Sequence, residues 1–388
     1  MTPKWLLPEY IDDILPAEAW RIEKLRSRVL DLFTVCGYEL VMPPLVEYLD
    51  SLLTGSGHDL GLRTFKLVDQ LSGRTLGLRA DITPQASRID AHLLNRQGIT
   101  RLCYSGSVVH TLPSGILKTR EPLQIGAEIY GHEGVESDVE IQQLMLRALA
   151  VAGVRNVHLD LGHVAIFRSL IQWAGIDRDT EAELFRTLQA KDKPALGTLT
   201  ASLRNDVRDA LQALPELYGG VEVLQAARRR LPDFPQLAAS LDTLEFIAGQ
   251  LAGEVGELFV DLAELRGYHY HSGAVFTAYV PGQTEAIARG GRNDEIGKAF
   301  GRARPATGFS IDLRDLASLA DGDGDPKRIL APYRPEDPQL QTTIQSLREA
   351  GNIVIVDLPG HDENRGELGC QQHLVARSGK WVVVSGKD

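Results

Sequence analysis

The chain has 388 residues, of which 43% are hydrophobic and 24% charged, as in ordinary globular proteins. No apolar run approaches the ~18 residues of a membrane-spanning helix, and the first residues lack a signal-peptide pattern. The net charge of −11 gives no electrostatic footprint for nucleic acid, and three scattered cysteines indicate neither a zinc site nor a disulfide framework. We therefore expect a cytoplasmic protein with no membrane or nucleic-acid partner.

The first predicted element is an amphipathic helix from Ala17 to Val35. Gly37 lies just beyond its end and leads into an extended segment that stops at Pro43. The apolar residues of the helix recur at helical spacing along one face: Ile22, Leu25, Val29, Leu32 and Phe33.

A hairpin and a second helix follow. Arg101 to Ser107 and Leu123 to Tyr130 are two extended segments around a loop that contains proline and glycine, Leu112 to Arg120. The second helix is expected to begin at Ser137, with Glu140 completing a capping box, and to continue to Gly153.

The second half of the core alternates strand and helix patterns. A half-buried strand is predicted from Asn156 to Leu161, and strand-forming residues return from Tyr268 to Val280. Between them, from Val164 to about Gly253, helical spacing dominates and indicates a helical insertion.

A linker is predicted from Ala320 to Pro326, where the sequence reads ADGDGDP. The tail beyond it shows one helix, Gln339 to Ala350, and two strands, Ile353 to Val356 and Trp381 to Val384. We expect this tail to form a small α/β unit.

Six segments in a fixed order resemble class II aminoacyl-tRNA synthetases, and among these the histidyl enzyme. The matching segments are GYELVMPPLVE (Gly37 to Glu47, motif 1), LRADITPQ (Leu78 to Gln85), the hairpin from Tyr104 to Gly131 (motif 2), LRGYHYHSGAVF (Leu265 to Phe276), ARGGRND (Ala288 to Asp294) and GFSIDLRDL (Gly308 to Leu316, motif 3).

The departures from the synthetase pattern concern its nucleotide chemistry. Where the synthetase has the Arg-x-Glu of motif 2, this chain has His110 and Leu112, and Arg314 and Asp315 replace the Glu-Arg that ends motif 3. Adenylate formation builds negative charge at phosphorus, and losing one positioned donor there costs about 10²–10³ in rate. An active synthetase is therefore disfavoured.

Synthetase-like segments without the phosphate-binding arginines make the chain similar to the regulatory subunit of ATP phosphoribosyltransferase, a paralogue of the synthetase. Two further segments, Trp5 to Ala19 and Leu78 to Ile89, also resemble that family. The resemblance implies an α+β fold: a class II antiparallel sheet flanked by helices in residues 1–319, with the insertion at about 164–253, and a small domain at 327–388. It also implies a homodimer through motif 1, a complex with the short-form catalytic subunit, histidine-dependent feedback, no cofactor and no catalytic residue.

The resemblance further implies a histidine site. Asp81, Thr83 and Gln124 would meet the ammonium group, Arg266 the carboxylate, and Glu128 with His271 the ring; Tyr270 completes the set. Asp81 stands where the synthetase has Glu, and His271 where it has Tyr.

Three other interpretations stay open. His269 and His271, two apart on a predicted strand, could share a metal, but no third ligand is visible. Arg289 to Arg292 could be a flexible cationic turn beside a ligand. The whole chain could instead be an active histidyl-tRNA synthetase or a free-standing histidine-binding regulator.

Overall fold

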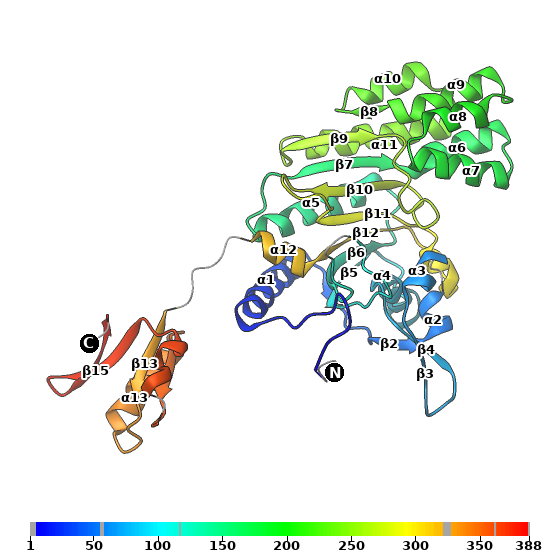
Figure 1. Ribbon diagram of the computed structural model, residues 1–388. Helices are drawn as coiled ribbons and strands as arrows, with labels where there is room; N and C mark the ends of the chain where they lie inside the picture. The colour runs from blue at the N-terminus through cyan, green and yellow to red at the C-terminus, as the bar shows by residue number, and fades with distance from the viewer. Residues whose placement is uncertain (1–4, 55–57, 116–117, 321–326, 361, 387–388) are drawn as a thin grey trace. The chain divides into compact units, whose positions relative to one another are not determined.

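The computed structural model describes residues 5–54, 58–115, 118–320, 327–360 and 362–386. The chain divides into two compact units, Met1–Ala320 and Asp321–Asp388 (Figure 1). Most of the predicted linker, residues 321–326, lies outside the described residues.

A nine-stranded sheet forms the centre of the first unit, in the order β1-β5-β6-β12-β11-β10-β7-β9-β8. Neighbouring strands from β5 to β7 are antiparallel, whereas β1 runs parallel to β5 and β9 parallel to β7. The sheet is therefore mixed rather than purely antiparallel. Its strands are β1 (Glu39–Leu40), β5 (Thr100–Ser107), β6 (Leu123–Tyr130), β7 (His158–His163), β8 (Tyr218–Gly219), β9 (Glu257–Asp261), β10 (Ala274–Tyr279), β11 (Ala288–Arg292) and β12 (Ala306–Asp312).

Three helices, α1 (Pro16–Val35), α5 (Val135–Val151) and α12 (Leu313–Leu319), pack on this sheet and on one another. The first predicted helix is confirmed, and its apolar face is buried at Ile22, Leu25, Val29 and Phe33.

The capping box predicted at Ser137 is wrong. Helix α5 begins two residues earlier, after an N-cap at Gly134, and Ser137 Oγ instead donates to the Gly134 carbonyl at 2.9 Å. Glu140 does not fold back to the helix start because Arg101 binds both of its carboxylate oxygens at 2.7 Å. The same pairing holds the pKa of Glu140 below its ordinary value.

The predicted helical insertion is present, and in Figure 1 its helices gather at the β7-β9-β8 side of the sheet. Its first and last helices, α6 and α11, pack against β10, and α11 also packs against β7. Asp177 and Asp192 cap two of them through side-chain bonds to backbone N–H groups. Within the described part of the chain, no helix is long and apolar enough to cross a membrane. The insertion consists of α6 (Val164–Ala174), α7 (Arg178–Gln189), α8 (Lys193–Thr200), α9 (Asn205–Ala213), η2 (Leu214–Glu216), α10 (Val223–Arg230) and α11 (Pro235–Leu251).

A second, three-stranded sheet in the order β2-β4-β3 lies before the hairpin in the sequence and carries short helices. The sequence pattern did not predict it. Its elements are β2 (Val46–Tyr48), α2 (Leu49–Leu53), α3 (His58–Arg63), β3 (Lys66–Val68), β4 (Thr75–Leu78), α4 (Thr83–Arg88) and the π-helix η1 (Ile89–Leu94).

The predicted strand from Tyr268 to Val280 forms only in its second half, as β10. The preceding residues turn instead, with His271 N donating to the Gly267 carbonyl at 2.7 Å and Gly267 at a φ of 68°. His269 and His271 therefore do not share a strand face, which removes the basis for a metal pair. The predicted turn from Arg289 to Arg292 is part of strand β11; the short helix η3 (Ile296–Phe300) follows it.

The second unit is a four-stranded sheet in the order β14-β13-β15-β16. Its core includes Ile329, Leu340, Ile344, Val354 and Leu374. The predicted helix and both predicted strands are confirmed, and two further strands, β13 and β15, join them. The elements are β13 (Arg328–Pro332), α13 (Pro338–Glu349), β14 (Ile353–Asp357), η4 (Asp362–Leu368), β15 (Gln372–Arg377) and β16 (Lys380–Ser385).

Candidate amino-acid binding site

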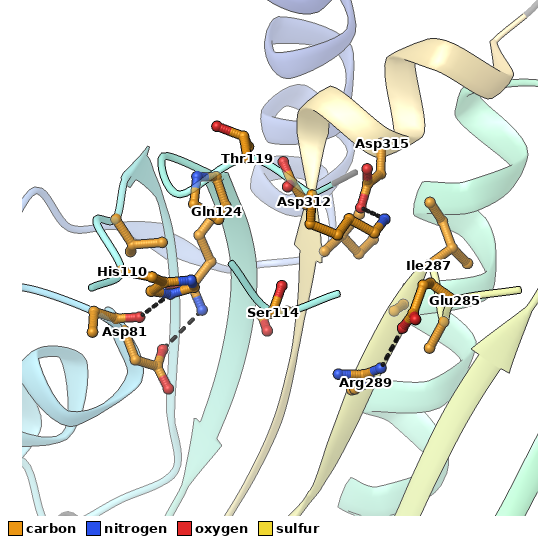
Figure 2. A pocket seen from close by; sticks show the side chains of 18 of the residues that line it. Asp81, His110, Ser114, Thr119, Gln124, Glu285, Ile287, Arg289, Asp312 and Asp315 are labelled. Carbon is orange, nitrogen blue, oxygen red and sulfur yellow. Dashed lines mark hydrogen bonds and ion pairs between the residues drawn. The ribbon is translucent and has the colours of Figure 1, made fainter. Parts of the chain in front are cut away.

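Two cavities adjoin one another over strands β11 and β12 of the large sheet. The inner cavity, of about 320 Å³, is lined by Thr83, Glu128, Tyr130, Tyr270 and His271 among others. The outer cavity, of about 250 Å³, is lined by His110, Lys118, Gln124, Asp312 and Asp315 among others (Figure 2). Four residues line both cavities: Arg63, Asp81, Arg289 and Ser310.

Glu128 is a buried residue that lines the inner cavity. Gln124 and Glu128 are four residues apart on β6, so their side chains leave the same face of the sheet. Gly308 lies directly opposite Glu128 on β12, and a Cβ at that position would collide with Glu128 Oε2. Only glycine there leaves room for the carboxyl group.

The Glu128 carboxyl is 5% exposed and hydrogen-bonded on one oxygen. Thr83 Oγ1 and Tyr104 OH donate to its Oε1 at 3.0 and 3.1 Å. Burial nevertheless raises the pKa of Glu128 to about 8; the hydrogen bonds from Thr83 and Tyr104 lower it and the nearby charge of Asp81 raises it, but burial is the largest effect. Glu128 is therefore mostly protonated at neutral pH.

Asp81 and Gln124 form a second polar group at the junction of the two cavities. Gln124 Nε2 donates to Asp81 Oδ1 at 2.8 Å, and Gln124 Oε1 accepts from the backbone N–H of Ile82 at 2.9 Å. Asp81 Oδ1 also accepts from the N–H of Thr83 at 3.0 Å. These bonds orient the carboxylate and leave its other oxygen to a cation.

His271 closes one side of the inner cavity as a neutral imidazole, because burial lowers its pKa to about 4. Its Nδ1 lies 3.3 Å from the carbonyl of Arg292, so Nδ1 carries the proton and Nε2 is left as an acceptor. Tyr130, which the sequence did not single out, is 2% exposed; its hydroxyl has no hydrogen-bond partner among the described residues. Both residues line the inner cavity.

Arg266 is the one expected histidine-binding residue that the structure does not bring to either cavity. Its Nη2 lies 2.7 Å from Glu264 Oε2, and its guanidinium lies over the ring of Tyr279. The other six, Asp81, Thr83, Gln124, Glu128, Tyr270 and His271, line one cavity or both.

The outer cavity carries two neighbouring carboxyl groups, Asp312 and Asp315. Asp315 is engaged by Lys118 Nζ at 2.6 Å, and burial together with Asp315 raises the pKa of Asp312 to about 6. His110, in place of the motif 2 arginine, is buried, and burial lowers its pKa. Among the described residues, no cluster of His, Cys, Asp and Glu could hold a metal ion.

Comparison with known proteins identifies two family models along the chain. The histidyl-tRNA synthetase model matches residues 10–316, and the model of the ATP phosphoribosyltransferase subunit HisZ C-terminal domain matches residues 326–384. The fold is similar to the crystal structure of an ATP phosphoribosyltransferase regulatory subunit/histidyl-tRNA synthetase from Bacillus halodurans, with a TM-score of 0.84 at 23% identity over 95% of this chain and 97% of that chain. A histidine–tRNA ligase subunit from Alicyclobacillus acidocaldarius gives 0.67 at 25% identity, over 82% and 98%.

Similarity to curated relatives extends over nearly the whole chain. The ATP phosphoribosyltransferase regulatory subunit of Nitrosospira multiformis is 61% identical over 384 residues, which cover 98% of each chain. That of Nitrosomonas eutropha is 57% identical over 389 residues, covering 98% of this chain and 99% of its own. The protein therefore belongs to the family of ATP phosphoribosyltransferase regulatory subunits.

Proposed function

We propose that this chain is the histidine-sensing subunit of an ATP phosphoribosyltransferase complex. It leaves phosphoribosyl transfer, the first step of histidine biosynthesis, to a separate short-form catalytic subunit, and it makes that subunit responsive to L-histidine. The names of its relatives support the complex, and its two cavities support the ligand.

The observation that carries the proposal is the contrast between the two cavities. The inner one keeps paired, oriented polar groups at Asp81, Thr83 and Glu128. The outer one has His110 and Asp315 at the two positions where the resemblance to the synthetase places phosphate-binding arginines. A chain that retains amino-acid recognition without nucleotide chemistry is suited to sensing rather than to adenylation.

The ammonium group and the imidazole ring of L-histidine each have a counterpart in the inner cavity or at its junction with the outer one. Asp81, oriented by Gln124, supplies a carboxylate for the ammonium group. Protonated Glu128 can donate to one ring nitrogen, and the Nε2 acceptor of His271 or the Tyr130 hydroxyl can meet a ring N–H. Such pairing is required, because burying an unpaired imidazole would cost free energy.

Self-association through the motif 1 region is part of the same proposal. Three large apolar side chains on and just after α1 are strongly exposed: Trp20 at 68%, Val35 at 83% and Met42 at 83%. Contiguous exposed apolar surface marks association sites, and these three side chains are the candidates for such a surface in this region. Light scattering should show a dimer of the parent chain and a shift towards monomer for Met42→Lys, whereas exposed Lys298→Glu, on η3, should stay dimeric.

The proposal is tested by isothermal titration of the full chain with L-histidine. We expect one site per chain, and binding lost in Asp81→Ala and Glu128→Ala. The exposed Glu295→Ala serves as the control and should bind like the parent. Parent-like binding by both site variants would contradict the assignment of the pocket.

The alternative of an active histidyl-tRNA synthetase has its own test. Histidine-dependent exchange of pyrophosphate into ATP requires the cations that His110 and Asp315 replace. We expect no exchange above a heat-inactivated sample. Exchange clearly above that background would favour the enzyme over the sensor.

A further inference from the structure

The turn that precedes β10, residues 265–272, carries two residues of the inner cavity, Tyr270 and His271. The turn is tight around Gly267, whose carbonyl accepts from the N–H groups of Tyr270 at 2.8 Å and of His271 at 2.7 Å. A Cβ on Gly267 would collide with the His271 ring. Where these two side chains lie in the cavity therefore depends on what holds the turn in place.

The first helix of the insertion, α6, holds this turn through Arg168. The N–H of Val164, the first residue of α6, donates to the Gly273 carbonyl at 3.1 Å, which fixes the start of the helix beside the end of the turn. Arg168 is four residues further on and so lies on the same face of the helix. Its Nη2 donates to the carbonyls of Tyr268 at 2.9 Å and of His271 at 3.1 Å. Arg168 thus binds the backbone of a cavity residue directly.

Side chains of α6 and α7 also surround Tyr268, which belongs to the same turn. The rings of Phe167 on α6 and Phe185 on α7 each have their centroid 5.4 Å from that of Tyr268. The Tyr268 hydroxyl donates to Glu181 Oε1 on α7 at 2.6 Å, and the Arg168 guanidinium lies 5.0 Å from the ring centroid. Tyr268 is buried, so the helices of the insertion anchor the turn on the side away from the ligand.

We propose that Arg168 is a positioning residue of the ligand site, which holds the turn so that the His271 ring can pair with the ring of the ligand. The inference rests on the proposed histidine-sensing function and gives the helical insertion a part in it. Without the guanidinium, two carbonyls lose a charged donor and the turn is free to shift. Hydrogen bonds weaken steeply away from their preferred geometry, so such a shift weakens the bond between His271 Nε2 and a ring N–H.

The test is a double-mutant cycle, measured by isothermal titration of the full chain with L-histidine. Arg168→Met is combined with His271→Leu, which removes both ring nitrogens. Since hydrogen bonds to charged groups are worth more than neutral ones, we expect Arg168→Met alone to weaken binding by roughly 10- to 100-fold. In the His271→Leu background the same change should weaken binding less than about threefold, because the group that Arg168 positions is already gone.

Three further variants complete the design. Arg168→Lys keeps a cationic donor for both carbonyls and should bind within about threefold of the parent; this rescue decides the test if His271→Leu binds too weakly for the cycle. Arg178→Met, at the exposed start of α7, is the matched control and should bind like the parent. A cooperative melting curve shows that Arg168→Met is folded; if it is not, Arg168→Gln replaces it.

Parent-like binding by Arg168→Met, an equal loss with and without His271, or failure of Arg168→Lys to restore binding overturns the positioning role and leaves histidine sensing intact. If the parent itself does not bind L-histidine, the sensing function fails, and this inference with it.

Discussion

Replacing Glu128 with glutamine should change how the stability of the protein depends on pH. The folded chain keeps the Glu128 proton at pH values where the unfolded chain has lost it, because burial raises the pKa from 4.5 to about 8. Stability is therefore lost as pH rises through this window. At about 1.4 kcal/mol for each pH unit, the full difference is roughly 5 kcal/mol. Glu128→Gln, which cannot ionise, should avoid this loss.

The measurement is urea unfolding between pH 5 and 8.5 at one protein concentration, followed by tryptophan fluorescence. Of the four tryptophans, Trp5, Trp20 and Trp173 lie in the first unit. The difference in unfolding free energy between Glu128→Gln and the parent should grow by several kcal/mol as pH rises from 5 to 8.5. The unfolding free energy of Glu183→Gln, changed at an exposed position, should depend on pH as that of the parent does. A Glu128→Gln profile within about 1 kcal/mol of the parent at every pH would refute the buried, protonated carboxyl.

Two further predictions address the packing around the site. Gly308→Ala should weaken L-histidine binding at least tenfold in calorimetry, since its Cβ collides with Glu128 Oε2 and overpacking of this kind costs about 1–3 kcal/mol; parent-like affinity would show that the carboxyl can move aside. Arg292→Met should lower the melting temperature by about 4–8 °C, because it leaves Asp138, 3% exposed, as an unpaired buried charge, which costs about 3–5 kcal/mol. An unchanged melting curve would show that this pair does not hold α5 against β11.

Elements with a strong local pattern could be predicted from the sequence. The helix α1 and the β5–β6 hairpin follow from apolar spacing and turn residues, which act over a few positions. The sheet β2-β4-β3 could not be found this way, since its strands have only three or four residues and β2 pairs with β4 about thirty residues further along the chain. The capping box failed for a related reason: Arg101, far away in sequence, is a stronger partner for Glu140 than the helix start.

The site residues also divide into those that a sequence motif indicated and those whose role depends on distant parts of the fold. Asp81, Thr83, Gln124 and Glu128 were expected from the resemblance and do lie together, because β6 carries Gln124 and Glu128 while Thr83, at the start of α4, and Asp81 just before it lie against them. Tyr130 carried no local signal, since its place in the inner cavity comes from neighbours that only the fold supplies. Arg266 was expected by its place in a motif, yet Glu264, two residues before it, engages its guanidinium.

Inhibition of the catalytic subunit by L-histidine, measured with the parent chain and with Asp81→Ala, tests the central claim most directly. The short-form catalytic subunit alone should be weakly active or insensitive to histidine, and the parent chain should confer inhibition. Asp81→Ala should relieve inhibition while co-purifying with the catalytic subunit as the parent does. Linkage requires that ligands of the catalytic subunit shift histidine affinity by the same factor, typically ~5–150-fold. Unchanged inhibition with Asp81→Ala, when calorimetry shows that this variant no longer binds histidine, would place the sensor on the other subunit.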